Sequence, residues 1–221
     1  MLSHLRFSLL TREQRFTEIY LRNRWCDSES HSGPGSTLAR TQALRDALCQ
    51  LLKDLRVRSV LDLGCGDFNW MKELSLDVDM YVGADIVPSL IETNQTQFGN
   101  QTRRFVQLDM ARDNLPSADL ILCRDCLVHL SLNHIRRALD RICGSNATYL
   151  LATTFTATTI NRNILTGHWR PLNLQETPFR FPLPVKLIAD QPLSGEYPDK
   201  CLALWRIDQL ASHFHKTNAL T

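Results

Sequence analysis

The sequence has 221 residues, a formal net charge of +2 and an apolar fraction of 43%, values that are ordinary for a soluble globular protein. This length suffices for one α/β domain with a sizeable core. The near-neutral charge argues against a nucleic-acid partner, because such proteins concentrate basic residues on one face and this chain has only short arginine doublets.

The sequence predicts no membrane segment and no secretory signal. No apolar run approaches the roughly 20 residues that cross a bilayer, and the opening MLSHLRFSLLTREQRF is too charged for a signal peptide. Seven cysteines, an odd number, favour reduced thiols and a cytoplasmic location. Cys123 and Cys126 form a CxxC pair without a second ligand pair, so we interpret them as packing positions and predict no metal site.

The N-terminal part, residues 1–56, is predicted to be helical around a polar loop. Aromatic and apolar residues at near-helical spacing indicate a helix over 13–25, followed by a loop over 27–36. An amphipathic helix is predicted over 38–55, with Ser36 or Thr37 as its cap.

Residues 57–155 alternate between apolar strands and helices. Strands are predicted over 58–63, 79–85, 103–108, 118–123 and 146–155, and helices over 67–74, 88–97 and 131–143. This βαβα order indicates an α/β fold with a parallel sheet that is covered by helices on both faces.

The alternation stops in the last part of the chain, residues 156–221. Four prolines within 167–184 exclude a regular helix or a central strand there. Residues 185–189 and 201–207 are predicted to form a closing strand pair, joined by the turn SGEYPDK. We see no domain boundary, so residues 1–221 are interpreted as a single domain.

A glycine turn ends the first predicted strand, in the stretch VLDLGCG. Ligands of open α/β sheets bind outside the carboxyl ends of the strands, and glycine lets the backbone approach them closely. A dinucleotide fingerprint needs a third glycine, where this chain has Asn69, and Asp62 adds a negative charge beside a pyrophosphate. A P-loop is excluded, because no Gly-Lys-Ser/Thr follows the turn.

Acidic residues also end the next two predicted strands. A carboxylate at Asp85, 19 residues after Gly66, can accept hydrogen bonds from both hydroxyls of a ribose. Asp109 can receive an amino group such as that of adenine. Together with Asp62, these acids suit a cofactor with a ribose, an adenine and a net positive centre.

The motifs VLDLGCG, YVGADI, FVQLD and ADLILCRDCLVHLS resemble, in order and spacing over about residues 58–155, those of class I S-adenosylmethionine-dependent methyltransferases. The resemblance implies S-adenosyl-L-methionine as the cofactor. It also implies a Rossmann-like, mostly parallel seven-stranded sheet whose last strand, 201–207, is antiparallel. The implied cofactor-binding residues are Gly64, Cys65 and Gly66 at the methionine moiety, Asp62 at its amino group, Asp85 at the ribose, Ile86 and Met110 at the adenine ring, Asp109 at its amine, and Cys123 and Arg124 on the methionyl side.

The leading loop and helix resemble the N-terminal helical lid of many family members. In that interpretation Trp25 and the turn 32–36, which ends at Ser36, close over the cofactor. A simple lead-in to the next helix is the alternative.

Two groups of residues are candidates for the acceptor side. Asp125 and His129 follow the fourth strand and are the candidate catalytic residues, because either could orient or deprotonate a hydroxyl or a protonated amine. His129 could instead pack against or cap the next helix. The candidate substrate-binding residues, in the proline-rich segment, are His168, Trp169, Arg170 and Asn173; the alternative is that Trp169 only anchors this loop.

We therefore predict a methyltransferase that modifies an oxygen or nitrogen atom of a small molecule or a peptide side chain. The N/D-P-P-Y/F motif of many nucleic-acid amine methylators is absent after the fourth strand, which reads CRDC. An NAD-dependent oxidoreductase and a non-catalytic methyltransferase-like binding module are the alternatives. The acceptor and the oligomeric state stay open.

Overall fold

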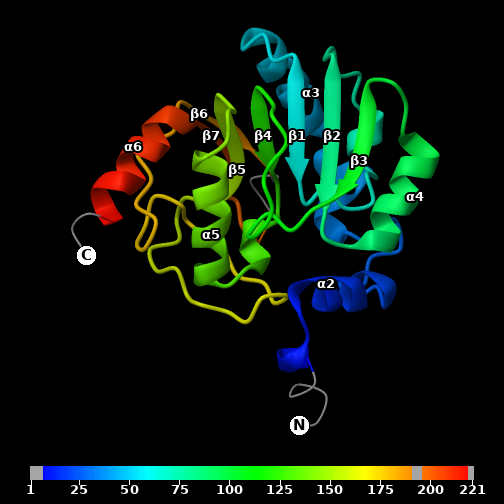
Figure 1. Cartoon of the computed structure of the whole chain (residues 1–221), viewed down its shortest axis with the longest axis horizontal. Coiled ribbons are helices and arrows are strands. Elements are labelled where there is room, and N and C mark those ends of the chain that lie inside the picture. The colour runs from blue at the N-terminus through cyan, green and yellow to red at the C-terminus, as the bar shows by residue number, and fades with distance from the viewer. Residues whose placement is uncertain (1–6, 191–195, 219–221) are drawn as a thin grey trace.

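Seven strands form one open sheet in the structure, a computed structural model that describes residues 7–190 and 196–218. The strands are β1 (Ser59–Leu63), β2 (Met80–Asp85), β3 (Arg103–Gln107), β4 (Leu120–Cys123), β5 (Tyr149–Phe155), β6 (Lys186–Ala189) and β7 (Lys200–Arg206). Their spatial order is β3-β2-β1-β4-β5-β7-β6 (Figure 1). Part of the predicted turn SGEYPDK, Ser194 and Gly195, lies outside the described residues.

The strand directions confirm the predicted sheet. β1 pairs in parallel with β2 and β4, and the parallel pairing continues to β3 on one side and to β5 on the other. The last strand, β7, is antiparallel to both β5 and β6, so the predicted closing pair is an antiparallel hairpin. The strand order reverses between β1 and β4, and this is the switch point at which such sheets bind ligands.

Helices cover both faces of the sheet. They are α2 (Arg12–Leu21), α3 (Leu38–Asp54), α4 (Pro88–Phe98), α5 (Leu132–Cys143) and α6 (Ile207–Asn218), with short 3-10 helices η1 (Pro34–Ser36), η2 (Met71–Glu73) and η3 (Leu127–His129). Leucines of α3 and α4 form one apolar cluster with the sheet, and the apolar side chains of α5 and α6 form another. Figure 1 shows α2 lying across the carboxyl ends of β1 to β3. Within the described residues, no helix has the length and apolar character to cross a bilayer.

The predicted helix over 67–74 is wrong. The chain forms turns there, followed by the three-residue helix η2. Phe68 has a positive φ of 59°, and Phe68, Trp70 and Met71 are all buried in the apolar cluster of α3 and α4. Side chains that are buried this close together along the chain cannot lie on one face of an α-helix, so packing overrides the helical pattern.

One helix end and one whole helix also differ from the prediction. Helix α2 ends at Leu21 rather than at residue 25, because Asn23 and Cys26 have left-handed backbone conformations. Helix α6 was not predicted at all. Ile207, assigned from the sequence to the last strand, begins this helix, and it packs with Leu210 into the cluster of α5.

Candidate active site

A cavity opens at the carboxyl ends of β1, β2 and β4. It contains about 1050 Å³ of empty space, a value that includes open solvent. Eleven of the twelve predicted cofactor-binding residues line it: Trp25, Ser36, Asp62, Gly64, Cys65, Gly66, Asp85, Ile86, Asp109, Met110 and Arg124. The twelfth, Cys123, is buried in the apolar core of β4 and is not part of the cavity wall.

The glycine turn has a backbone conformation and close contacts that a residue with a side chain would not fit. Gly64 has a φ of 78° and Gly66 a φ of 56°, in the left-handed region that favours glycine. A Cβ atom on Gly64 would lie 2.7 Å from the Sγ atom of Cys126, and one on Gly66 would collide with the hydroxyl of Ser32. The N–H group of Gly64 donates to the carbonyl of Ala84 at 2.8 Å, which fixes the turn against β2.

Asp62 is a buried carboxylate in the cavity wall, and Asp85 is a half-buried one. Asp62, 4% exposed, accepts a hydrogen bond from the hydroxyl of Tyr81 at 2.6 Å, and burial raises the pKa of Asp62 to about 7. Asp85 accepts hydrogen bonds from the N–H groups of Gly66 at 3.2 Å and Val87 at 3.1 Å. Burial raises the pKa of Asp85 as well. In both cases burial outweighs the hydrogen bonds that stabilise the ionised form, and a ligand with ammonium and hydroxyl groups would add to that stabilisation.

Asp109 has a partner that the sequence analysis missed. The Nε atom of Arg12, at the start of α2, donates to the Oδ2 atom of Asp109 at 2.9 Å. The Oδ1 atom of Asp109 accepts the N–H group of Ala111 at 3.0 Å. A ligand amine at Asp109 would share this carboxylate with Arg12, and no local sequence pattern connects two residues that are 97 positions apart.

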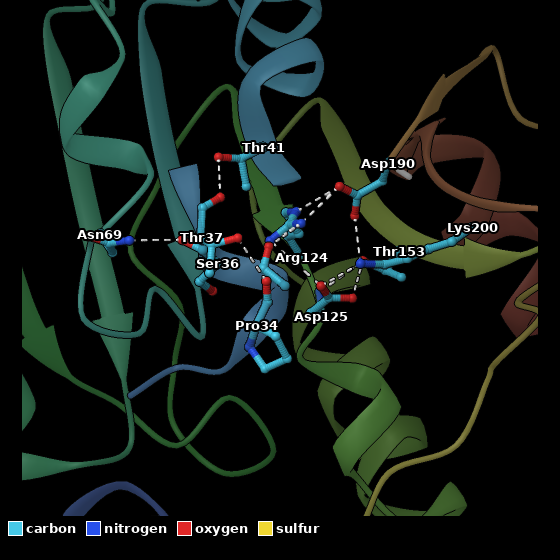
Figure 2. A network of polar contacts seen from close by, with 11 residues as sticks. Pro34, Ser36, Thr37, Thr41, Asn69, Arg124, Asp125, Thr153, Asp190 and Lys200 are labelled. Atoms are coloured by element: carbon cyan, nitrogen blue, oxygen red, sulfur yellow. Dashed lines mark hydrogen bonds and ion pairs between the residues drawn. The ribbon is translucent and has the colours of Figure 1, made fainter. Parts of the chain in front are cut away.

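The N-terminal segment over residues 12–36, which we call the covering segment, lies over the cavity. Its contributions to the cavity wall include Phe16, Tyr20, Trp25 and Ser32. Several contacts hold the segment in place, and three of them lie close to the glycine turn or the candidate catalytic residues. The N–H group of Asp67 donates to the hydroxyl of Ser32 at 2.8 Å, and the side-chain amide of Asn69 donates to the carbonyl of Ser36 at 3.1 Å (Figure 2). The ring of Trp25 lies 5.0 Å from that of His129, measured between centroids. Of these lining residues, Trp25 and Ser32, which begins the turn 32–36, were predicted to close over the cofactor, whereas Phe16 and Tyr20 were not.

Arg124 and Asp125 belong to a group of four charged side chains, which we call the ion cluster: Arg124, Asp125, Asp190 and Lys200 (Figure 2). Arg124 donates to Asp190 through Nε at 3.1 Å and through Nη2 at 2.9 Å. Its Nη2 atom also donates to the carbonyl of Gly35 at 2.8 Å. Lys200 lies 2.6 Å from Asp125 and 3.0 Å from Asp190. The cluster thus joins the covering segment to the ends of β4 and β6 and to the start of β7.

Asp125 and His129, the candidate catalytic residues, both line the cavity. Burial alone would raise the pKa of Asp125, but the charges of Lys200 and Arg124 outweigh it and lower this pKa to about 2. Burial lowers the pKa of His129, so its neutral form is favoured. The Nδ1 atom of His129 lies 3.0 Å from the carbonyl oxygen of His168. Because a carbonyl only accepts, Nδ1 carries the hydrogen, and Nε2 of the neutral ring keeps its lone pair.

The four candidate substrate-binding residues do not line the cavity. Arg170 is buried and donates to the backbone carbonyls of Leu127, Val128 and Leu130. The buried side-chain amide of Asn173 donates to the carbonyls of Thr156 and Thr158. These hydrogen bonds hold the loop in place, and a contact of either side chain with substrate stays a prediction.

His168 and Trp169 lie on the surface of the same loop. The carbonyl of His168 orients His129, while its ring lies 6.0 Å from that of Phe7. Trp169 is 42% exposed and packs against Phe155 and Tyr197. Trp169 thus keeps an accessible surface as well as an anchoring role.

Comparison with known proteins identifies the family whose sequences this chain resembles. A family model described as a methyltransferase domain matches residues 38–218. Uncharacterized methyltransferases of Mycobacterium tuberculosis (strain ATCC 25618 / H37Rv) and Mycobacterium bovis are 31% identical over 101 residues, which cover 45% of this chain and 50% of each relative. The matched part of the chain therefore spans about half the length of these curated relatives.

Solved structures show the same fold. The N-methyltransferase NodS from Bradyrhizobium japonicum WM9, in complex with S-adenosyl-L-homocysteine, is similar with a TM-score of 0.58 and 17% identity, over 85% of this chain and 97% of that one. Human N-acetylserotonin methyltransferase, in complex with S-adenosylmethionine, has a TM-score of 0.56 and 18% identity, over 89% of this chain and 60% of that one. From the family match and the sheet order together, the chain belongs to the methyltransferase-domain family and has the Rossmann-like fold of class I S-adenosylmethionine-dependent methyltransferases.

Proposed function

We propose that this protein transfers a methyl group from S-adenosylmethionine to a nitrogen or oxygen atom of a small molecule or a peptide side chain. The observation that carries the proposal is the convergence of the glycine turn with Asp62, Asp85 and Asp109 on one cavity. Family membership supports the same function, and the neighbouring structures contain this cofactor or its demethylated product.

The residues of the cavity fit S-adenosylmethionine. The glycine turn gives the methionine moiety access to the backbone, with the buried Asp62 at its amino group. Asp85 would accept hydrogen bonds from the ribose hydroxyls, and Asp109 would accept one from the adenine amine. When bound, the cofactor supplies an electrophilic methyl group on a positively charged sulfur atom.

On the acceptor side, this chain offers a base and a fixed hydrogen-bond acceptor. The Nε2 atom of His129 has a free lone pair and can take a proton from the attacking atom. Asp125 is held ionised by Lys200, so it orients the acceptor rather than taking the proton. Trp25 and the segment that contains it cover this end of the cavity and reduce the access of water.

The nicotinamide alternative loses its physical basis in this structure. A dinucleotide pyrophosphate binds at the N-terminus of the helix that follows the first strand. Here β1 is followed by turns and the three-residue helix η2, so that helix terminus does not exist. For the non-catalytic alternative, the placement of His129 and Asp125 in the same cavity as the predicted cofactor residues favours catalysis.

Titration calorimetry with S-adenosylhomocysteine and with NAD tests the cofactor. We expect saturable binding of S-adenosylhomocysteine only. Substituting Asp85→Ala is expected to weaken this binding by about 1–3 kcal/mol, because a bidentate acceptor in the cavity wall is lost. The control Asp77→Ala removes an exposed carboxylate before β2, at the opposite end of the sheet, and is expected to change nothing. Binding of NAD alone, or unchanged affinity in a folded Asp85→Ala variant, would contradict the proposal.

A further inference from the structure

The end of the cavity around Asp125 and His129 offers negative charge and lone pairs to an acceptor molecule. The side chain of Asp125 is 26% exposed. Lys200 and Arg124 both approach its Oδ2 atom, while the hydroxyl of Thr153 is 3.5 Å from Oδ1. An ionised carboxylate has about four lone-pair positions, so Asp125 retains capacity to accept a further hydrogen bond.

The ion cluster makes the charge of Asp125 permanent. Lys200, 5% exposed, lies between Asp125 and the fully buried Asp190, and Arg124 bonds to Asp190 from the other side (Figure 2). Because two cations and two carboxylates face one another, the cluster is electrically balanced without a ligand. A proton on Asp125 would leave the buried Lys200 with less compensation, and so the anionic form persists.

His129, which lines the same cavity as Asp125, presents a second lone pair. Its Nδ1 atom is committed to the carbonyl of His168 at 3.0 Å, so Nε2 is the accepting atom of the neutral ring. The charged groups that act on His129 are Asp125, Arg170 and Lys200. Burial is the largest influence and lowers the pKa of the ring, so the neutral form, with a lone pair on Nε2, predominates at neutral pH.

The cavity wall as a whole favours positively charged molecules. Its charged residues are four carboxylates, Asp62, Asp85, Asp109 and Asp125, and two guanidinium groups, Arg12 and Arg124. Both guanidinium groups are already paired, with Asp109 and with Asp190. S-adenosylmethionine carries one net positive charge, which leaves an excess of negative charge in the wall. An anionic acceptor would therefore find no unpaired cation among the described lining residues.

We propose that the methyl acceptor is an amine that enters the cavity as an ammonium ion and binds between Asp125 and His129. This inference rests on the proposed function and names the substrate class of the same site. Asp125 would form a charge-assisted hydrogen bond with the ammonium group. The ring of Trp25, which lies 5.0 Å from that of His129 at an interplanar angle of 38°, would add an aromatic contact to the cation. Asp190 and Lys200 are positioning residues, because they do not line the cavity: Lys200 holds Asp125, and Asp190 holds Lys200 and Arg124.

The reaction balances with the groups that are present. One N–H proton of the ammonium ion passes to the Nε2 atom of His129, which leaves a neutral amine and an imidazolium ion. The nitrogen lone pair then forms the new C–N bond with the methyl group while the C–S bond breaks and its electron pair stays on sulfur. The products are a methylated ammonium ion and S-adenosylhomocysteine, and His129 releases its proton to solvent.

Three fragments with one ring and different end groups test the inference: 2-phenylethylamine, 2-phenylethanol and phenylacetate. Their binding to the protein saturated with S-adenosylhomocysteine is measured by ligand-observed NMR titration at neutral pH. The amine is expected to bind about tenfold more tightly than the alcohol, as for one charge-assisted hydrogen bond, and the acid to bind most weakly. Equal binding of amine and alcohol, preference for the acid, or no detectable amine binding would overturn the inference.

A charge-balanced variant assigns the selectivity to Asp125. The double substitution Asp125→Asn with Lys200→Met removes one charge of each sign from the ion cluster, so it avoids an uncompensated buried lysine. We expect this variant to bind S-adenosylhomocysteine normally and to lose the preference for the amine. The matched control Glu73→Gln, at an exposed position of η2, removes a carboxylate outside the cavity and is expected to retain it.

The result separates this inference from the proposed function. If S-adenosylhomocysteine does not bind to the wild-type protein, the proposed function itself fails. If it binds and the double variant still prefers the amine, only the assignment of the acceptor class to Asp125 fails.

Discussion

Among the single residues of the cavity, Asp62 has a pKa that burial shifts into the neutral range, so its protonation should affect ligand binding. Desolvation raises its pKa to about 7, although the hydroxyl of Tyr81 opposes the shift. Without a ligand, the carboxylate is therefore protonated below about pH 7. An ammonium group pairs only with the ionised form, so binding below this pH must first remove a proton. Asp85 acts with the same sign, because burial also raises its pKa.

The affinity for S-adenosylhomocysteine should thus fall as the pH is lowered through 7. We expect a loss of about tenfold per pH unit in the acid limb, which calorimetry between pH 5.5 and 8 would measure. Tyr81→Phe removes a hydrogen bond that lowers the pKa, so it should move the limb to higher pH. In the Asp62→Asn variant, the affinity for S-adenosylhomocysteine should be lower and should change less with pH. A flat wild-type profile over this range would contradict the role of Asp62.

At the scale of the elements, helix α3 begins with a cap that its own sequence does not contain. Thr37 occupies the cap position, but its side chain makes no capping hydrogen bond, contrary to the prediction for Ser36 or Thr37. Instead the Oε1 atom of Glu29 accepts the N–H group of Leu38 at 2.7 Å. The same atom accepts the side-chain amide of Asn69 at 2.7 Å. One carboxylate therefore connects the covering segment, α3 and the turn after β1.

Removing this cap should loosen the start of α3. Glu29→Ala is expected to lower the free energy of unfolding by about 1 kcal/mol, as for other lost helix caps, and to speed amide hydrogen exchange at Leu38. Glu29→Gln retains an acceptor oxygen and should have a smaller effect. If exchange at Leu38 were the same in Glu29→Ala as in the wild type, Glu29 would not be the cap.

At the scale of the whole molecule, the ion cluster joins segments that are far apart in the sequence. Arg124 follows β4, Asp190 follows β6 and Lys200 begins β7, while the carbonyl of Gly35 belongs to the covering segment. Asp190 has a fully buried side chain between the two cations. Its loss would leave both charges without their shared partner, so its effect is expected on the fold as a whole.

Asp190→Asn should lower the free energy of unfolding by about 3–5 kcal/mol, the cost of breaking a buried ion pair by removing one partner. Urea unfolding followed by circular dichroism would measure it. Adding Lys200→Met restores the charge balance and should recover part of the loss. The control Asp79→Asn breaks the exposed pair with Arg58 and should have a much smaller effect. Equal effects of the two aspartate substitutions would show that the ion cluster does not stabilise the fold.

The sequence by itself determined the sheet and one end of the site. Apolar runs that alternate with helical periodicity fix β1 to β5, and an acid or glycine at the end of a parallel strand necessarily lies at the carboxyl edge of the sheet. For this reason the amino-acid pattern alone was enough to predict that Asp62, Gly64, Asp85 and Asp109 lie close together. The resemblance of these motifs to one family added the antiparallel last strand.

Only the tertiary structure decided the partners of these residues. Arg12 with Asp109, Glu29 with α3, and Asp190 with Lys200 are contacts between side chains whose segments meet only after folding. Such pairs leave no periodic signal, because their distance along the chain is set by topology and not by the geometry of one helix or strand. The same reason explains the stretch after β1, where burial of Phe68, Trp70 and Met71 in one cluster replaced the predicted helix.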